Sequence, residues 1–302
     1  MPAGFDPLSH PILFSTPRAQ SGWSAWVEHF PFGWLLIDLL RPQTLVELGT
    51  HFGDSYLCFC QAVADLKLPT RCWAVDTWTG DQHSGPYGQE VLRYLKANHD
   101  APYGSFSTLV QKKFDDALMQ FSDGQIDLLH IDGLHTYDAV RHDVDTWMPK
   151  LSRHGVIVMH DTQVQQGGFE VWRVWSEISQ GRPSFEFVHG YGLGVVAIGP
   201  DVPPALLEWI EFANANREMI GTFFRAQGQH MECIRRLTAL TAIMLRQGTF
   251  LRPMAEARGM VWQLPTRFSP AFTNVLFYAE SITQFIERLA TERSTNPPNQ
   301  TP

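Results

Sequence analysis

Two short stretches of the chain combine histidine and aspartate at spacings that suit acid–base or metal chemistry. The first runs from His130 to Asp145 and contains three histidines and four aspartates behind a run of apolar residues. The second is His160–Asp161, which ends the run "GVIVMHD". Imidazole exchanges protons near neutral pH and binds transition metals, and carboxylates bind hard cations. The composition alone allows either a metal and acid–base site or a charged surface helix.

The expected secondary structure divides the first stretch near Thr136. Asp132 ends an expected strand at 126–132, and His135 follows three residues later. The pair His160–Asp161 ends the next expected strand, at 155–161. Ligands of open α/β sheets bind beyond the carboxyl ends of the strands, so these four side chains are expected to converge on one crevice.

The second half of this stretch is expected on the helix that follows. Residues four apart lie one turn apart on a helix surface, and a solvated face is the expected environment for charged residues there. The residues concerned are Asp138, His142, Asp143 and Asp145.

Strands and helices alternate from about residue 24 to residue 199. A helix is expected from about Ser24 to Leu40, ending before Pro42. Apolar strands separated by helices are typical of a parallel sheet that is buried on both faces. The sequence therefore predicts an α/β fold with a doubly wound, mainly parallel seven-stranded sheet. Its strands are expected at 44–50, 71–78, 107–111, 126–132 and 155–161, with a closing antiparallel pair across 185–199.

The first strand ends in a turn with two glycines, "ELGTHFGDS" at 47–55. Gly49 and Gly53 allow the backbone to approach a ligand closely, and the next helix offers free N–H groups at its N-terminus. The second strand ends in Asp76, an acid placed to accept both hydroxyls of a ribose. The turn lacks the GxGxxG spacing, which argues against an NAD-dependent oxidoreductase. The loop at 79–88, which holds His83 and Tyr87, is expected to close over the site.

Five motifs in this order give the chain a family resemblance. They are "LVELGTHFGDSY", "WAVDTWTGD", "IDLLHIDGLHTYDAVRHDVDTW", "GVIVMHDT" and "HGYGLGVVAIG", within residues 23–200. Together they resemble the class I S-adenosylmethionine-dependent methyltransferases, which have a Rossmann-like fold. More narrowly, they are similar to the small-molecule and sugar O-methyltransferases that are often associated with glycosyltransferases. The resemblance implies methyl transfer to a hydroxyl of a sugar, glycoside or similar polar small molecule.

The resemblance also implies a site for S-adenosyl-L-methionine. The first turn would surround the methionine end, Asp76 would bind the ribose, and Trp78 and Asp115 would lie near the adenine. For Trp78, packing in the core is an equally good interpretation. The implied cofactor-binding residues are Glu47, Gly49, His51, Gly53, Ser55, Asp76, Trp78 and Asp115.

Oxygen methylation needs help with the hydroxyl proton, because a hydroxyl is a weak nucleophile at neutral pH. A base, a divalent cation or both can supply it. Metal-dependent relatives have carboxylates at the ends of these two strands, and Asp132 and Asp161 match two of those positions. The macrolide-sugar O-methyltransferases have a base three residues after the first metal acid, and His135 has that spacing. The resemblance therefore implies that His135, Asp132 and Asp161 are catalytic.

The third metal position departs from the family pattern. An acid is usual there, and this chain has His160. Mg²⁺ prefers oxygen ligands, whereas histidine suits Mn²⁺ or Fe²⁺. Two alternatives remain open: a divalent cation held by Asp132, His160 and Asp161, or a second base at His160 with no metal.

The chain is expected to contain four segments. These are an irregular lead-in at 1–22, the methyltransferase domain at 23–200, a helical extension at 203–292 and a disordered tail at 293–302. The extension is expected to form a homo-oligomer, with docking of a glycosyltransferase as the alternative. A competing hypothesis is a catalytically silent, methyltransferase-like assembly module that partners a glycosyltransferase, but the complete set of motif residues argues against it.

Charge and composition exclude several other classes. Lys and Arg number 23 against 31 Asp and Glu, with no basic block, so a nucleic-acid partner is not expected. No apolar run reaches the roughly 20 residues of a membrane span. The four cysteines lack CxxC spacing, and the N-terminus lacks an export signal, so a cytoplasmic enzyme is expected.

Overall fold

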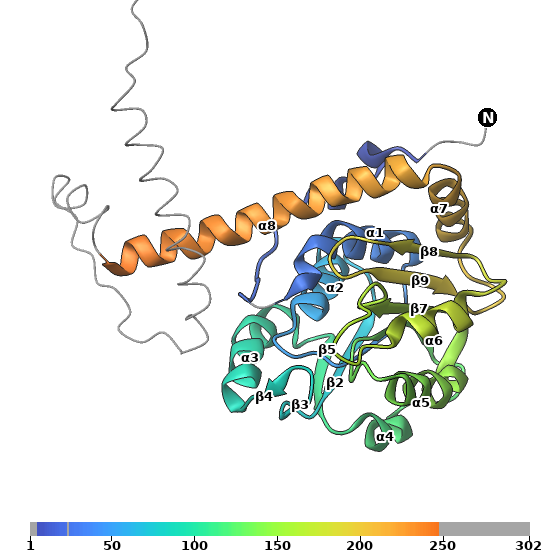
Figure 1. The fold of residues 1–302 in the computed structure, drawn as a ribbon, viewed down its shortest axis with the longest axis horizontal. Coiled ribbons are helices and arrows are strands. Elements are labelled where there is room, and N and C mark those ends of the chain that lie inside the picture. The colour runs from blue at the N-terminus through green and yellow to red at the C-terminus, as the bar shows by residue number, and fades with distance from the viewer. Residues whose placement is uncertain (1–4, 23, 248–302) are drawn as a thin grey trace, which may run out of the picture. The chain divides into compact units, whose positions relative to one another are not determined.

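The computed structural model describes residues 5–22 and 24–247. Its central element is a seven-stranded sheet with the order β5-β2-β1-β6-β7-β9-β8 (Figure 1). Among these strands β9 is antiparallel to both of its neighbours, and the other pairings are parallel. The predicted doubly wound, mainly parallel sheet with an antiparallel ending is confirmed.

The strands lie where the apolar runs of the sequence predict them. In β1 every residue is buried, as expected for a strand covered on both faces. The bounds are β1 (Thr44–Leu48), β2 (Arg71–Asp76), β5 (Ser107–Gln111), β6 (Ile126–Ile131), β7 (Leu151–His160), β8 (Ser184–Phe187) and β9 (Leu193–Ala197).

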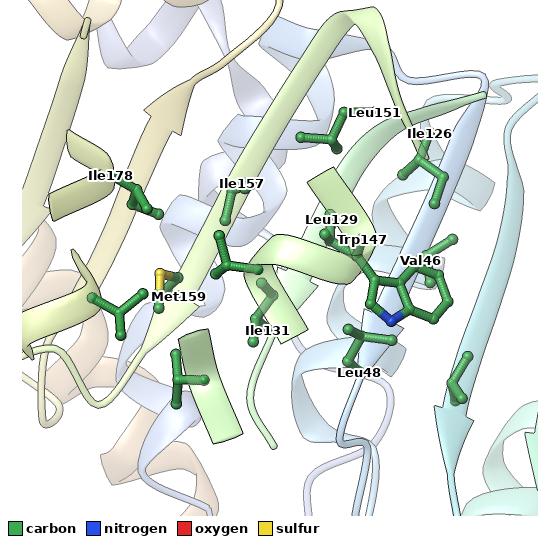
Figure 2. Packing of buried hydrophobic residues seen from close by; sticks show 14 of the residues in the cluster. Val46, Leu48, Ile126, Leu129, Ile131, Trp147, Leu151, Ile157, Met159 and Ile178 are labelled. Carbon is green, nitrogen blue, oxygen red and sulfur yellow. The ribbon is translucent and has the colours of Figure 1, made fainter. Parts of the chain in front are cut away.

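Helices cover both faces of this sheet. On one face Trp147 packs among Val46, Leu48, Leu129 and other strand residues, as Figure 2 shows. The helices on this side are α4 (Phe114–Ala117), α5 (Tyr137–Trp147) and α6 (Val171–Ser179). On the opposite side α1 (Phe30–Leu40) packs against α2 (Asp54–Asp65), and α3 (Gln89–Tyr103) lies beside α2.

The predicted helix at 24–40 is in fact two elements. A 3₁₀ helix, η3 (Ala25–His29), precedes α1, and the Ser24 hydroxyl accepts a hydrogen bond from the Trp26 N–H at its start. Pro31 lies in the first turn of α1, where its missing N–H leaves no unsatisfied partner, so the α-helix begins there. The helix ends at Leu40, before Pro42, as predicted.

Shorter elements connect the larger ones. A two-stranded antiparallel hairpin formed by β3 (Gly80–Asp81) and β4 (Gly85–Pro86) follows β2 and occupies the predicted loop at 79–88. We call residues 79–88 the hairpin loop. The remaining 3₁₀ helices are η1 (Pro7–Ser9), η2 (Pro11–Phe14), η4 (Leu118–Gln120) and η5 (Met148–Lys150).

The chain divides into two compact units, residues 1–231 and 232–302. After the sheet come α7 (Pro204–Ala215) and α8 (Arg217–Gln247), so α7 and the start of α8 belong to the first unit. The part of the predicted extension beyond residue 247 and the predicted tail at 293–302 lie outside the described residues. No helix within the described ranges is long and apolar enough to cross a membrane.

An aromatic cluster joins α7 and the start of α8 to the sheet. The ring of Trp209 lies 5.1 Å from that of Phe32 on α1, and the ring of Phe224 lies 5.2 Å from that of Phe187 on β8. All four side chains are buried. The first part of the helical region therefore completes the core of the sheet domain, whereas the sequence places a domain boundary near residue 200.

Replacement of Trp209 by alanine should destabilise the whole sheet domain. Truncation of a large buried aromatic side chain typically costs about 3–5 kcal/mol. We expect Trp209→Ala to lower the free energy of unfolding by about that amount in urea, in one transition with the sheet. Glu208→Ala, on the exposed side of the same helix, is the matched control. A separate, early transition of α7 would contradict the common core.

Candidate active site

One cavity of about 830 Å³ lies at the carboxyl ends of the parallel strands. Its wall is formed by the turn after β1, the hairpin loop, and the segments that follow β6 and β7. Nine of the predicted site residues line it: Gly49, His51, Gly53, Ser55, Asp76, Asp132, His135, His160 and Asp161. The structure thus brings together the two groups of residues that the sequence singles out separately.

Gly49 brings the turn after β1 against the backbone that follows β6. Its φ is +85°, and a Cβ atom there would lie 2.1 Å from the Asp132 carbonyl oxygen. The Asp132 N–H donates to the Leu48 carbonyl at 2.8 Å. Only a glycine permits this backbone conformation and this approach together. The glycine turn and Asp132 are therefore fixed relative to each other.

Asp76 holds the same turn from the end of β2. One carboxylate oxygen accepts the N–H groups of Thr50 and His51 at 2.8 and 2.9 Å, and the other accepts that of Trp78 at 2.7 Å. A carboxylate offers about four acceptor positions. Three of these positions on Asp76 are used by backbone N–H groups, and the Tyr87 hydroxyl also hydrogen-bonds to this carboxylate.

Trp78 and Asp115 do not line the cavity. Trp78 is fully buried, and its indole N–H donates to the His51 carbonyl at 3.0 Å, which supports the turn from behind. Asp115 is exposed and pairs with His142 at 2.9 Å on the surface. Its neighbour Phe114 does line the cavity. Trp78 therefore has the core position that the sequence left as an equal alternative, and Asp115 lies on the surface beside the cavity-lining Phe114.

Glu47 also lies outside the cavity lining, in a buried polar group beneath it. The Nδ1–H of His130 donates to the Glu47 carboxylate at 2.8 Å, and the Trp26 indole N–H donates to Nε2 of His130 at 3.2 Å. Both Glu47 and His130 are fully buried. Burial raises the pKa of Glu47, and the hydrogen bond from His130 opposes this effect. The Trp26 hydrogen bond sets the tautomer of His130.

Asp132, His135, His160 and Asp161 form one cluster, which we call the His–Asp cluster. Nε2 of His135 lies 3.0 Å from Asp161 Oδ2 and 3.6 Å from Asp132 Oδ1. Nδ1 of His160 lies 3.6 Å from Asp132 Oδ1 and 3.5 Å from Asp161 Oδ1. The convergence predicted for these four residues is confirmed.

The carboxylates and histidines of the cluster shift each other's pKa values. Burial alone would raise the pKa of Asp161, but His160 and His135 lower it to about 2. Burial would likewise lower the pKa of His135, but Asp132 and Asp161 raise it to about 9. The pKa of Asp132 is lowered and that of His160 is raised for the same reason. Protons and a bound cation would therefore compete for the same carboxylates and imidazoles.

The geometry of the cluster also fits a metal ion. Ligand atoms of Asp132, His135 and Asp161 lie within 4.8 Å of one another. Ligands at about 2.0–2.2 Å from an ion are about 3.0–3.5 Å apart, which is close to the spacings found here. Nε2 of His135 is buried and makes no hydrogen bond despite its short distance to Asp161. Asp161 has a φ of +60°, a strained conformation of the kind that gathers at functional sites.

His160 has a supporting contact typical of a metal ligand. Its Nε2–H donates to the Gly190 carbonyl at 3.0 Å, which leaves Nδ1 facing the two carboxylates. Histidine ligands usually donate their second N–H to a carbonyl or carboxylate. His29 donates to the same carbonyl at 3.0 Å. The residues present therefore fit a cation that accepts both oxygen and nitrogen ligands.

Sequence reasoning missed two residues that shape the site. Phe169 lines the cavity, and its ring stacks on that of His135 with centroids 4.3 Å apart. His29 packs against His160 with ring centroids 5.6 Å apart. Phe169 lies in a loop and His29 at the start of α1, so neither follows a strand end, and no spacing in the sequence marks them.

Of the four α5 residues that the sequence predicts to be solvated, only one is buried. Asp138, His142 and Asp145 are exposed on α5, as expected. Asp143 is only 6% exposed, so the expected solvated environment is wrong for this residue. Burial raises its pKa to about 7, with His142 opposing and Asp115 adding to the shift.

Comparison with known proteins gives a family match that covers this site. Residues 46–162 match the family model of a methyltransferase domain. The matched segment begins in β1 and ends just after Asp161, so it contains the glycine turn, Asp76 and the whole His–Asp cluster. The candidate site therefore lies within the part of the chain that is similar to a methyltransferase domain.

The chain is also similar to one curated protein and to several solved structures. The uncharacterized protein y4gI of Sinorhizobium fredii is 47% identical over 200 residues, which make up 66% of this chain and 21% of that protein. The chain thus spans about a fifth of the length of this curated relative. The O-methyltransferase TomG of Streptomyces achromogenes, solved with SAM, is 17% identical over 58% of this chain and 87% of that chain, with a TM-score of 0.42. A putative O-methyltransferase of Klebsiella pneumoniae is 16% identical over 65% and 91% of the two chains, with a TM-score of 0.43.

Replacement of Asp143 by asparagine should stabilise the protein at alkaline pH. A raised pKa means that the fold favours the neutral acid, so stability is present at low pH and is lost as pH rises through about 7. We expect Asp143→Asn to raise the free energy of unfolding by on the order of 1–3 kcal/mol at pH 8, and by clearly less at pH 5.

Thermal unfolding at both pH values checks this expectation. Asp138→Asn, which removes an exposed carboxyl of the same helix, is the control and should show little dependence on pH. An equal effect of Asp143→Asn at pH 5 and pH 8 would show that the carboxyl is not held neutral.

Proposed function

We propose that the protein is an S-adenosylmethionine-dependent O-methyltransferase that acts on a hydroxyl of a sugar, glycoside or similar polar small molecule. One observation carries the proposal: the glycine turn of the methyltransferase match and the His–Asp cluster line the same cavity. A methyl donor held by the turn and a hydroxyl held at the cluster would then face each other.

The residues around the glycine turn suit S-adenosyl-L-methionine. Gly49, His51, Gly53 and Ser55 line the cavity beside the N-terminus of α2, which offers N–H groups to the methionine carboxylate. A ribose hydroxyl at Asp76 would take the place of the Tyr87 hydroxyl, which lines the same cavity. We assign Phe114, which lines the cavity after β5, to the adenine.

Three of the predicted cofactor-binding residues do not line the cavity, and we propose that they support the residues that do. Trp78 holds the His51 carbonyl, and Glu47 lies in the buried group beneath the turn. Asp115 is paired on the surface with His142. We therefore assign these three residues to the shape of the site rather than to direct contact with the cofactor.

We assign proton removal to His135. Its ring lines the cavity and its Nε2 lies 3.0 Å from Asp161 Oδ2, so an acceptor hydroxyl bound at the two carboxylates would lie next to it. In-line transfer of the methyl group to oxygen requires mainly positioning and removal of this proton. Asp132 and Asp161 orient the hydroxyl, directly or through a cation.

A divalent cation, Mg²⁺, Mn²⁺ or Fe²⁺, is proposed as an aid to this step. Asp132 and Asp161 would hold it, and His160 would be the third ligand because Gly190 already accepts its second N–H. Such a cation lowers the pKa of a bound hydroxyl. The histidine ligand favours Mn²⁺ or Fe²⁺ over Mg²⁺.

The remaining expectations stay proposals. A cytoplasmic location, a homo-oligomer and a glycosyltransferase partner have no structural observation of their own. The alternative of a silent assembly module is disfavoured because the glycine turn, Asp76 and the complete His–Asp cluster converge on one cavity.

Calorimetric titration with S-adenosylmethionine tests the donor site. We expect binding in the micromolar range, and we expect Asp76→Ala to weaken it by roughly 10-fold to 100-fold because the turn loses its anchor and the ribose loses an acceptor. Asp116→Ala, on the exposed part of α4, should bind as the wild type does. No binding by well-folded wild-type protein would overturn the proposal in favour of the assembly module.

Replacement of His135 tests the chemical step. With a glycoside acceptor found by screening, His135→Gln should lower kcat by about 10²-fold to 10⁴-fold and leave the affinity for S-adenosylmethionine unchanged. His230→Gln, an exposed histidine of α8, is the control. Wild-type rates in His135→Gln would exclude this residue as the base.

The same assay tests the cation. Treatment with a chelator should lower the rate, Mn²⁺ or Fe²⁺ should restore it, and His160→Gln should raise the concentration of Mn²⁺ needed. A full rate after complete chelation would favour the alternative in which His160 is a second base.

A further inference from the structure

A second histidine contacts the proposed base on the side away from the carboxylates. Nδ1 of His83 lies 3.3 Å from Nδ1 of His135, close enough for one ring to donate and the other to accept. His83 lies in the hairpin loop and lines the cavity. The position of the shared proton decides which nitrogen of His135 keeps a lone pair that can accept a proton from a substrate.

The two possible directions of this hydrogen bond have different consequences. If neutral His135 carries its proton on Nε2, the ring has no lone pair there and cannot accept the proton of an acceptor hydroxyl. If the proton is on Nδ1, it is donated to His83 and Nε2 keeps a lone pair. A base requires the second arrangement, and so would a metal ligand.

We propose that His83 is a positioning residue that accepts the Nδ1–H of His135 and so keeps the Nε2 lone pair aimed at the acceptor hydroxyl. The inference rests on the proposed function, because it assigns His83 a part in the same methyl transfer. His83 itself touches neither the hydroxyl nor the methyl group in this assignment.

The hairpin loop holds His83 in the required place. The Asp81 carboxylate accepts the N–H groups of His83 and Ser84 at 2.7 and 2.8 Å, which fixes the tip of the loop. Gly80, with a φ of +81°, allows the two arms to approach, since a Cβ there would lie 2.0 Å from the Gly85 carbonyl oxygen. The backbone at His83 is therefore defined by contacts within the loop.

Phe169 supports both imidazole rings on one aromatic surface. Its centroid lies 4.5 Å from that of His83 and 4.3 Å from that of His135, with interplanar angles of 22° and 11°. The Glu170 N–H next to it donates to the His135 carbonyl at 2.8 Å. Because each imidazole ring is nearly parallel to the Phe169 ring and stacks on it, neither imidazole can rotate freely. The two Nδ1 atoms therefore stay in contact.

Two substitutions separate hydrogen bonding from stacking. His83→Phe keeps a ring that can stack on Phe169 and removes the acceptor. His83→Asn removes the ring and places an amide oxygen near the position of Nδ1. Gln82→Ala, an exposed residue at the tip of the same hairpin loop, is the control.

The activity readout separates a positioning role from a structural one. We expect His83→Phe to lower kcat about 10-fold to 100-fold, a range typical for loss of such supporting partners, with KM and affinity for S-adenosylmethionine within about twofold of the wild type. His83→Asn should recover most of the lost rate. Full activity in His83→Phe would overturn the proposal, as would an equal defect in both variants with weakened cofactor binding.

A second readout does not depend on activity. In ¹⁵N-labelled protein, imidazole proton–nitrogen correlations assigned with the His83→Phe and His135→Gln variants show which Nδ1 carries the shared proton. We expect it on His135, and we expect its low-field signal to vanish in His83→Phe. A proton found on His83 would overturn the inference. Failure of the proposed function would instead appear as absent cofactor binding or methyl transfer.

Discussion

The close approach of Gly49 to the Asp132 carbonyl is the constraint on which the site depends. It joins the turn after β1 to the residue that opens the His–Asp cluster, with no side chain between them. The N–H of Asp132 and the carbonyl of Leu48 add a hydrogen bond at the same place. Because β1 and β6 are neighbours in the sheet, a donor bound at the turn and an acceptor bound at Asp132 occupy one cavity.

Buried charge is concentrated at this edge of the sheet and is balanced locally. Burying an unpaired carboxylate is strongly unfavourable, so each one needs a partner. Beneath the turn, Glu47 has His130, which is itself held by Trp26. In the cavity wall, Asp132 and Asp161 share two histidines. Asp76 instead uses backbone N–H groups. These three arrangements keep acids near the cavity while the strands around them stay apolar.

The sequence predicts the sheet from its apolar runs, and it predicts the His–Asp cluster from the residues at the ends of two neighbouring strands. A strand of a parallel sheet delivers the residue after it to one edge, whatever the loops do, so Asp132 and Asp161 could be placed together. Strand ends could not decide between core packing and ligand contact for Trp78, and they did not show that Asp115 pairs with His142 or that Asp143 is buried. Whether a side chain after a strand faces the cavity or the core depends on loop dihedral angles, such as the φ of +51° at Trp78.

One further feature of the site depends on contacts between distant parts of the chain. Phe169 stacks with His83 and His135 from three separate segments, and no local pattern predicts that meeting.

The start of the helical region is connected to the site through the last two strands. Phe187, at the end of β8, packs against Trp209 of α7 and Phe224 of α8. Three residues later the Gly190 carbonyl accepts hydrogen bonds from His29 and His160. The helices thus fix the segment that orients His160 toward the two carboxylates. A domain cut at the end of β9 would keep every residue of the cluster, but it would lose the packing that holds the Gly190 carbonyl in place.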